Sequence, residues 1–115
     1  MAETASAARQ QLMEQEVARF VRILTEHGNP ERVIVFGSLA SGQVHAWSDI
    51  DLVIVEKTDL PFWQRLRQTR RLLRPKVGTD ILVYTPEEFE QLRRDRTFFR
   101  EEILAKGMVV YERGS

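Results

Sequence analysis

Four short runs rich in β-branched and aromatic residues punctuate this chain: RVIVFG at 32–37, DIDLVIV at 49–55, TDILVYT at 79–85 and MVVYE at 108–112. Runs of this length and composition are typical of strands. The segments between them carry apolar residues at three- and four-residue spacing, which indicates helices with one apolar face. Because strands and helices of this kind must bury that face against another layer, the chain is restricted to a sheet with helices packed on it.

The ends of the expected helices follow from their terminal residues. Pro75 ends one helix, and Thr85 followed by Glu88 is a capping-box pattern with Pro86 at the first helical position. We expect a long helix ending near His27, a helix started by Asp59 and Pro61, a short helix from Thr85 to about Leu92, and a last helix from Thr97 to Gly107. The order α-β-β-α-β-α-α-β predicts an α/β (α+β) fold over residues 1–115, a single domain with a mixed sheet of about four strands flanked by helices.

Composition excludes several classes of function. The chain has 115 residues with 17 basic and 17 acidic side chains, so it shows no bias toward nucleic acid or membrane surfaces. Without cysteine it has no disulfide, thiolate zinc site or cysteine nucleophile, and two histidines are too few for a histidine-built metal site. No apolar run approaches the roughly 20 residues that span a bilayer, and the N-terminus does not resemble a signal peptide. We expect a cytoplasmic protein.

Two aspartates occupy the start of an otherwise apolar strand. Because side chains alternate across a strand, Asp49 and Asp51 are expected on one face, about 6.5–7 Å apart along the backbone, with Ile50, Leu52 and Ile54 on the other face. Two such carboxylates repel each other, and one must take up a proton unless a cation lies between them. A hard divalent ion such as Mg²⁺ prefers carboxylate oxygens and removes this conflict. The pair is therefore interpreted as half of a metal site.

Asp80 repeats this placement as the second residue of the next strand. If the two strands are neighbours, three carboxylates converge, which is enough to hold two metal ions about 3.5–4 Å apart for phosphoryl or nucleotidyl transfer. Gly37 allows the backbone to approach an anion closely, and Ser38 can donate its hydroxyl and N–H if it opens a helical turn. The sequence thus predicts a triphosphate site between Gly37-Ser38 and the aspartates. The structural alternative is that Ser38 caps a turn and the aspartates flank strands in solvent.

Gly37-Ser38, residues 39–48, Asp49-Ile50-Asp51 and a later strand aspartate together resemble the minimal nucleotidyltransferases of the DNA polymerase beta superfamily. The resemblance runs from about Val33 to Tyr84, and the segment FFREEILAKGMVVYER is similar to the end of these domains. It implies the nucleotidyltransferase fold, with Asp49, Asp51 and Asp80 as catalytic residues and Mg²⁺ ligands.

The same resemblance implies a reaction and a partner. Gly37 and Ser38 would hold ATP, and a nucleoside monophosphate, usually AMP, would pass to an acceptor hydroxyl while pyrophosphate leaves. The acceptor is expected on another protein, because minimal nucleotidyltransferases are commonly antitoxins paired with a small helical HEPN-domain toxin that they can AMPylate. The acceptor, the nucleotide preference and the oligomeric state, including a homo-oligomer, stay open.

The chain departs from the family pattern at one position. Family members often carry arginine or lysine after the alanine of this loop, whereas this chain reads Ser38-Leu39-Ala40-Ser41-Gly42. A cation that would help to hold phosphates is missing at Ser41. The alternative hypothesis is therefore a non-catalytic module that keeps the fold and binds a nucleotide or a partner by contact. A sugar-nucleotide transferase, a third reading of Asp-x-Asp, is disfavoured because no second substrate domain is expected.

Overall fold

The computed structural model describes residues 2–114. Its elements in chain order are α1 (Ala2–His27), β1 (Arg32–Phe36), α2 (Ser38–Ser41), β2 (Ile50–Val55), α3 (Phe62–Leu73), β3 (Thr79–Tyr84), α4 (Pro86–Asp95), the π-helix η1 (Phe99–Leu104) and β4 (Met108–Glu112). All four predicted strands form, and each begins or ends within one residue of its predicted bounds. Among these helices, none is long and apolar enough to cross a lipid bilayer.

The strands form one sheet in the order β3-β2-β1-β4. β1 pairs antiparallel with both β2 and β4, whereas β2 and β3 are parallel and are joined through α3. A parallel pair needs such a crossover, because a short turn can only reverse the chain direction. The predicted mixed sheet of about four strands flanked by helices is confirmed.

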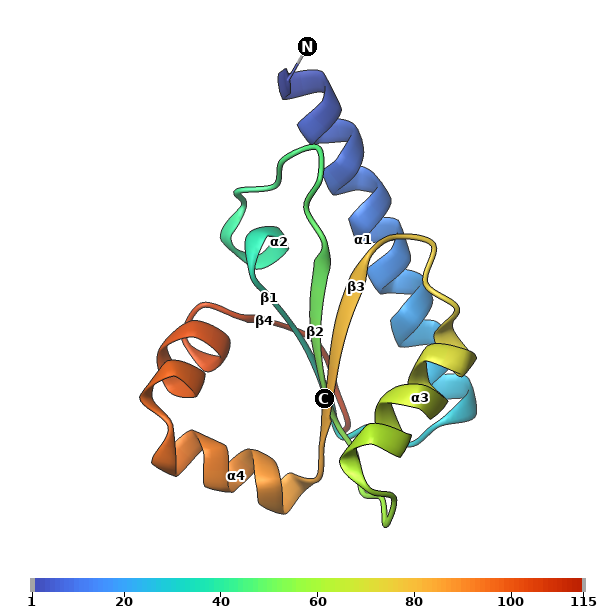
Figure 1. The fold of residues 1–115 in the computed structure, drawn as a ribbon, viewed down its shortest axis with the longest axis vertical. Helices are drawn as coiled ribbons and strands as arrows, with labels where there is room; N and C mark the ends of the chain where they lie inside the picture. The colour runs from blue at the N-terminus through green and yellow to red at the C-terminus, as the bar shows by residue number, and fades with distance from the viewer. Residues whose placement is uncertain (1, 115) are drawn as a thin grey trace.

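Helices cover both faces of the sheet (Figure 1). α1 and α3 lie on one face, where Phe20, Leu52, Ile54 and Leu73 belong to the same buried cluster. α4 and η1 lie on the other face, where Val53 packs in a second cluster with aromatic residues of these helices. The alternation along β2 thus puts Ile50, Leu52 and Ile54 on the α1 side, as predicted, and gives Asp51 and Val53 to the opposite face.

The start of α3 differs from the prediction. Asp59 does not cap the helix: the N-cap position is Pro61, with φ −58° and ψ 153°, and no side chain caps it. The turn before it is instead made by Thr58, whose hydroxyl accepts a hydrogen bond from the Leu60 N–H at 3.1 Å. Proline then enters the helix from an extended conformation, and Arg65 N–H makes an intrahelical bond to the Pro61 carbonyl at 3.1 Å.

The last predicted helix is present but has the wider π geometry. The Ala105 N–H donates to the Arg100 carbonyl, five residues earlier, at 2.9 Å. A Cβ at Gly107 would lie 2.0 Å from the Ile103 carbonyl oxygen, so only glycine fits where the chain leaves this helix for β4. The widened turn buries Phe99 and Ile103 while Phe98 is 68% exposed. Helical periodicity alone did not distinguish this geometry from an α-helix.

Candidate active site

The three predicted aspartates lie at the end of the sheet where β1 ends and β2 and β3 begin, beside α2 (Figure 1). Asp51 and Asp80 are each the second residue of their strand and are direct register partners across the parallel pair. Asp49 immediately precedes β2, where the Ile50 N–H donates to the Gly78 carbonyl at 2.9 Å. Parallel pairing therefore brings together carboxylates that are far apart in the sequence.

Two glycines leave the space that these carboxylates occupy. A Cβ at Gly37 would lie 2.1 Å from Asp51 Oδ2, and a Cβ at Gly78 would lie 2.3 Å from Asp49 Oδ1. Gly37 also has φ 71° and ψ −149°, a backbone conformation that is nearly restricted to glycine. Gly37 thus places the chain against Asp51, whereas its predicted close approach to a phosphate stays a prediction, and the role of Gly78 was not predicted.

The charges of this group are not compensated within the sheet. Burial raises the pKa of Asp51 to about 6, helped by the charge of Asp80, a side-chain hydrogen bond to Asp80 and the charge of Asp49. The carboxyl group therefore takes up a proton more readily than an ordinary aspartate until a cation offsets the neighbouring charges. Perturbed carboxyl groups of this kind cluster at functional sites.

Ser38 is the first residue of α2, directly after Gly37, so it opens a helical turn. The prediction that Ser38 donates its N–H and hydroxyl to a phosphate depends on this position. Gly37 is the N-cap residue of this short helix, which has no side-chain cap. The Ser41 N–H donates to the Gly37 carbonyl at 3.0 Å. The Ser41 hydroxyl bonds back to the Ser38 carbonyl at 3.2 Å. Ser41 is thus turned to its own helix and supplies no positive charge to the site.

A family model described as polymerase beta, nucleotidyltransferase, matches residues 19–115. The chain belongs to this family. A relative from Methanocaldococcus jannaschii, named as a candidate protein adenylyltransferase, is 31% identical over 100 residues, which cover 85% of this chain and 97% of the relative. The predicted resemblance is confirmed, and the chain is a nucleotidyltransferase.

Solved structures agree on the fold. A candidate nucleotidyltransferase from Sulfolobus solfataricus superposes with a TM-score of 0.59 and 20% identity, over 96% of this chain and 86% of that chain. A toxin–antitoxin structure with AMP-PNP superposes with a TM-score of 0.55 and 18% identity, over 83% of this chain and 72% of that chain. At these identities the likeness supports the nucleotidyltransferase fold.

The carboxylates of this nucleotidyltransferase fit a divalent cation by their chemistry. Asp51 and Asp80 offer oxygen ligands side by side, and burial with two neighbouring carboxylates raises the pKa of Asp51, which a bound cation would lower again. Within residues 2–114, however, no three acidic or histidine side chains are gathered closely enough to hold an ion as they stand. Asp49, the third carboxylate, forms an ion pair with an arginine of another element.

That arginine, Arg9 of α1, was not predicted as a site residue. Its Nε donates to the Ser48 carbonyl at 2.9 Å, and its Nη2 lies 3.8 Å from Asp49 Oδ1. Nothing in the local sequence could have indicated this contact, because α1 crosses the sheet 39 positions away from Ser48. The nucleotidyltransferase site therefore includes a cation from outside its motif.

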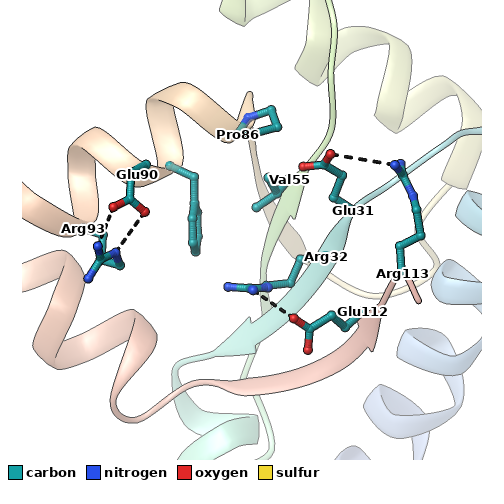
Figure 2. A pocket seen from close by; sticks show the side chains of 9 residues that line it. Glu31, Arg32, Val55, Pro86, Glu90, Arg93, Glu112 and Arg113 are labelled. Carbon is teal, nitrogen blue, oxygen red and sulfur yellow. Dashed lines mark hydrogen bonds and ion pairs between the residues drawn. The ribbon is translucent and has the colours of Figure 1, made fainter. Parts of the chain in front are cut away.

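A pocket of about 610 Å³ lies at the opposite end of the sheet and contains none of the predicted site residues (Figure 2). Its arginines each face a glutamate: Arg32 with Glu112 at 2.9 Å, Arg113 with Glu31 at 3.7 Å, and Arg93 with Glu90. Because each arginine of this pocket is paired with a glutamate, the pocket has no group of neighbouring carboxylates like Asp51 and Asp80. We therefore place the candidate active site at the aspartates and not in this pocket.

Proposed function

We propose that this nucleotidyltransferase transfers AMP from ATP, with Mg²⁺, to a hydroxyl group on a partner protein. The observation that carries the proposal is the contact of Asp51 with both Asp80 and Gly37, which combines uncompensated carboxylates with a backbone turn that a side chain would block. The name of the Methanocaldococcus relative supports an adenylyl group, and the AMP-PNP in a structural neighbour supports ATP.

The proposed reaction forms one bond and breaks one. The acceptor hydroxyl oxygen bonds to the α-phosphorus of ATP, the bond from that phosphorus to the oxygen bridging to the β-phosphate breaks, and pyrophosphate leaves with the electron pair. The hydroxyl proton passes to a carboxylate, for which we assign Asp80 because it is the exposed member of the Asp51–Asp80 pair. Mg²⁺, when bound, would neutralise the phosphates and lower the pKa of the attacking hydroxyl.

The chain's own residues would bind and orient the substrate. Asp49, Asp51 and Asp80 would hold Mg²⁺, and Gly37 and Ser38 would contact the triphosphate, Gly37 by close backbone approach and Ser38 through its hydroxyl and N–H. Holding the α-phosphorus beside the acceptor would convert the transfer into an effectively unimolecular step.

The acceptor is proposed to be a protein in a toxin–antitoxin pair. The relative's name specifies protein adenylylation, and one structural neighbour is a toxin–antitoxin assembly. A helical HEPN-domain toxin, with this chain as its antitoxin, is the partner implied by the family resemblance.

The test is transfer of label from [α-³²P]ATP to the protein encoded beside this chain. We expect Mg²⁺-dependent labelling that Asp51→Asn abolishes. Asp59→Asn, at an exposed aspartate outside the site, serves as a matched control and should label like wild type. Labelling that persists in Asp51→Asn would refute the assigned chemistry.

A second candidate function is favoured by one specific observation, the Ser41 hydroxyl that bonds to its own helix where the family often has a cation. In this case the chain binds its partner without transfer. Two measurements separate the functions. In calorimetry, a module that acts by contact alone should bind the partner with the same affinity in the wild type and in Asp49→Asn. In a pyrophosphate assay, such a module releases none, whereas the proposed enzyme releases pyrophosphate.

A further inference from the structure

Arg9 reaches the aspartates from the N-terminal part of α1, before the region that matches the family model. Its side chain is 23% exposed, whereas that of Asp49 is 55% exposed. The 2.9 Å bond from Nε to the Ser48 carbonyl holds the guanidinium at the loop that leads into β2. Arg9 is thus a cation held by one hydrogen bond, next to the solvent-exposed carboxylate of Asp49.

The contacts of Arg9 leave most of its hydrogen-bonding capacity unused. A guanidinium has five N–H donors, and within the described residues only Nε makes a hydrogen bond. The 3.8 Å separation between Nη2 and Asp49 Oδ1 is an ion pair but is too long for a hydrogen bond. The remaining N–H groups can therefore donate hydrogen bonds to a further anion while Nε keeps its bond to the Ser48 carbonyl.

The site needs such a cation. Residues 36–55, which include the loop between β1 and β2, contain no lysine or arginine, and Ser41 supplies no charge. A triphosphate is bound best by fixed cations, and the planar guanidinium suits phosphate oxygens because it donates two parallel hydrogen bonds. Among the side chains shown to contact the aspartates, Arg9 provides this chemistry.

We propose that Arg9 holds Asp49 while the site is empty and binds the phosphates of the nucleoside triphosphate when Asp49 turns to the metal ion. This rests on the proposed function. It accounts for the ion pair of Asp49 with Arg9 at a corner where the side chains of the described residues, as they stand, form no three-ligand metal site. It makes metal binding depend on nucleotide, because the metal alone must compete with Arg9 for Asp49, and the nucleotide removes that competition.

The test compares Arg9→Gln, which removes the charge, with Arg9→Lys, which keeps it without the planar fork. Arg22→Gln is the matched control, because Arg22 lies on the same helix in an exposed ion pair with Glu26. Two affinities are measured by calorimetry: that for Mn²⁺ alone, and that for the non-hydrolysable α,β-methylene-ATP with Mg²⁺. Thermal unfolding confirms that each variant is folded.

For Arg9→Gln we expect Mn²⁺ alone to bind several-fold more tightly and the nucleotide analogue to bind about tenfold more weakly, the loss expected for a charged hydrogen bond. Arg9→Lys should bind Mn²⁺ like wild type and the analogue with intermediate affinity. Arg22→Gln should change neither affinity.

An arginine that only fastens α1 to the loop would lower the unfolding temperature and leave both affinities unchanged, and that result would overturn the proposal. So would a change in one affinity alone. These readouts need no turnover. A wild-type protein that binds metal and nucleotide but labels no partner would contradict the proposed function and still allow the Arg9 proposal to be tested.

Discussion

Asp51 occupies a position in the sheet where a carboxylate is unfavourable without a cation. It is partly buried, contacts Gly37 and lies in register with Asp80, and its pKa is raised to about 6. A side chain chosen only for stability would be neutral here. The conflict between folding and charge is expected where a site is built to bind metal and phosphate.

We therefore expect Asp51→Asn to stabilise the metal-free protein at pH 7. Asparagine keeps the shape and removes the repulsion by Asp80 and Asp49. The gain should be about 1–2 kcal/mol, which is less than the full pKa shift implies because solvent screens the group. Urea denaturation in EDTA measures it, with Asp59→Asn, an exposed aspartate outside the site, as control. Destabilisation by Asp51→Asn would show that the carboxylate is structural.

The stabilities of the wild type and of Asp51→Asn should depend differently on pH. A carboxyl group whose pKa is raised on folding stabilises the folded state below its usual pKa of 3.8, and this contribution is lost as the pH rises through about 6. The advantage of Asp51→Asn should accordingly be small at pH 4 and reach its maximum above pH 7. An advantage that stays constant between pH 4 and 8 would contradict this electrostatic origin.

The backbone conformation of Gly37 and its close approach to Asp51 are also needed for the site. Gly37→Ala should cost about 1–3 kcal/mol of backbone strain and displace the Asp51 carboxylate, so that nucleotide binding is lost. Gly42→Ala is the matched control, because Gly42 has a positive φ of 78° but its Cβ would meet nothing within 4 Å. Calorimetry with the ATP analogue should show binding by Gly42→Ala only. Equal binding by both variants would argue against a site at this turn.

Sequence reasoning reached some of these residues and not others. Strand alternation and turn chemistry predicted Gly37, Asp49 and Asp51 as site residues, and the structure places Gly37 against Asp51. Gly78 and Arg9 were missed, because their contacts with Asp49 depend on how β3 and α1 pack.

At the scale of elements, a buried arginine joins α3, β3 and α4. Arg65 donates to the Leu60 carbonyl at 2.8 Å, to the Val83 carbonyl at 3.2 Å and to Glu88 Oε1 at 2.6 Å. Glu88 also accepts from the Thr85 N–H at 2.8 Å, which completes the predicted capping box. One ion pair therefore fixes the start of α4 and the crossover helix around β3.

Glu88→Gln should lower the free energy of unfolding at pH 7 by about 1–2 kcal/mol, because it leaves Arg65 without its counter-charge while part of the carboxylate is solvated. Arg65 holds the pKa of Glu88 below its usual value, so this stability is present above pH 4.5 and is lost as the pH falls through the lowered pKa. Urea titrations at pH 7 and pH 3 measure both effects. Glu90→Gln, in an exposed pair of the same helix, should show no measurable change; a similar loss in both variants would contradict the role of the buried pair.

The elements themselves were predicted because strand composition, proline and the capping box act locally. The capping box of Thr85 and Glu88 formed as predicted, but Asp59 did not cap α3, and the π geometry of η1 was not predicted. The burial of Arg65 was not predicted. A helix pattern shows which positions are polar but not which polar side chain another element covers.

At the scale of the whole molecule, strand order creates the site. β2 lies between an antiparallel and a parallel neighbour, so the end of β1 and the starts of β2 and β3 meet at one end of the sheet. Gly37 and Asp51 come from this antiparallel junction, and Asp80 comes from the parallel one. The fold class could be predicted from the sequence, whereas the strand order required the structure.

The most direct measurement is the crystal structure of the protein with α,β-methylene-ATP and Mn²⁺, with the metal located by its anomalous scattering. We expect a manganese peak in contact with Asp51 and Asp80, the triphosphate against Gly37 and Ser38, and Asp49 turned to the metal. Nucleotide and metal bound away from these aspartates, for example in the pocket lined by Arg32 and Arg93, would contradict the proposed active site.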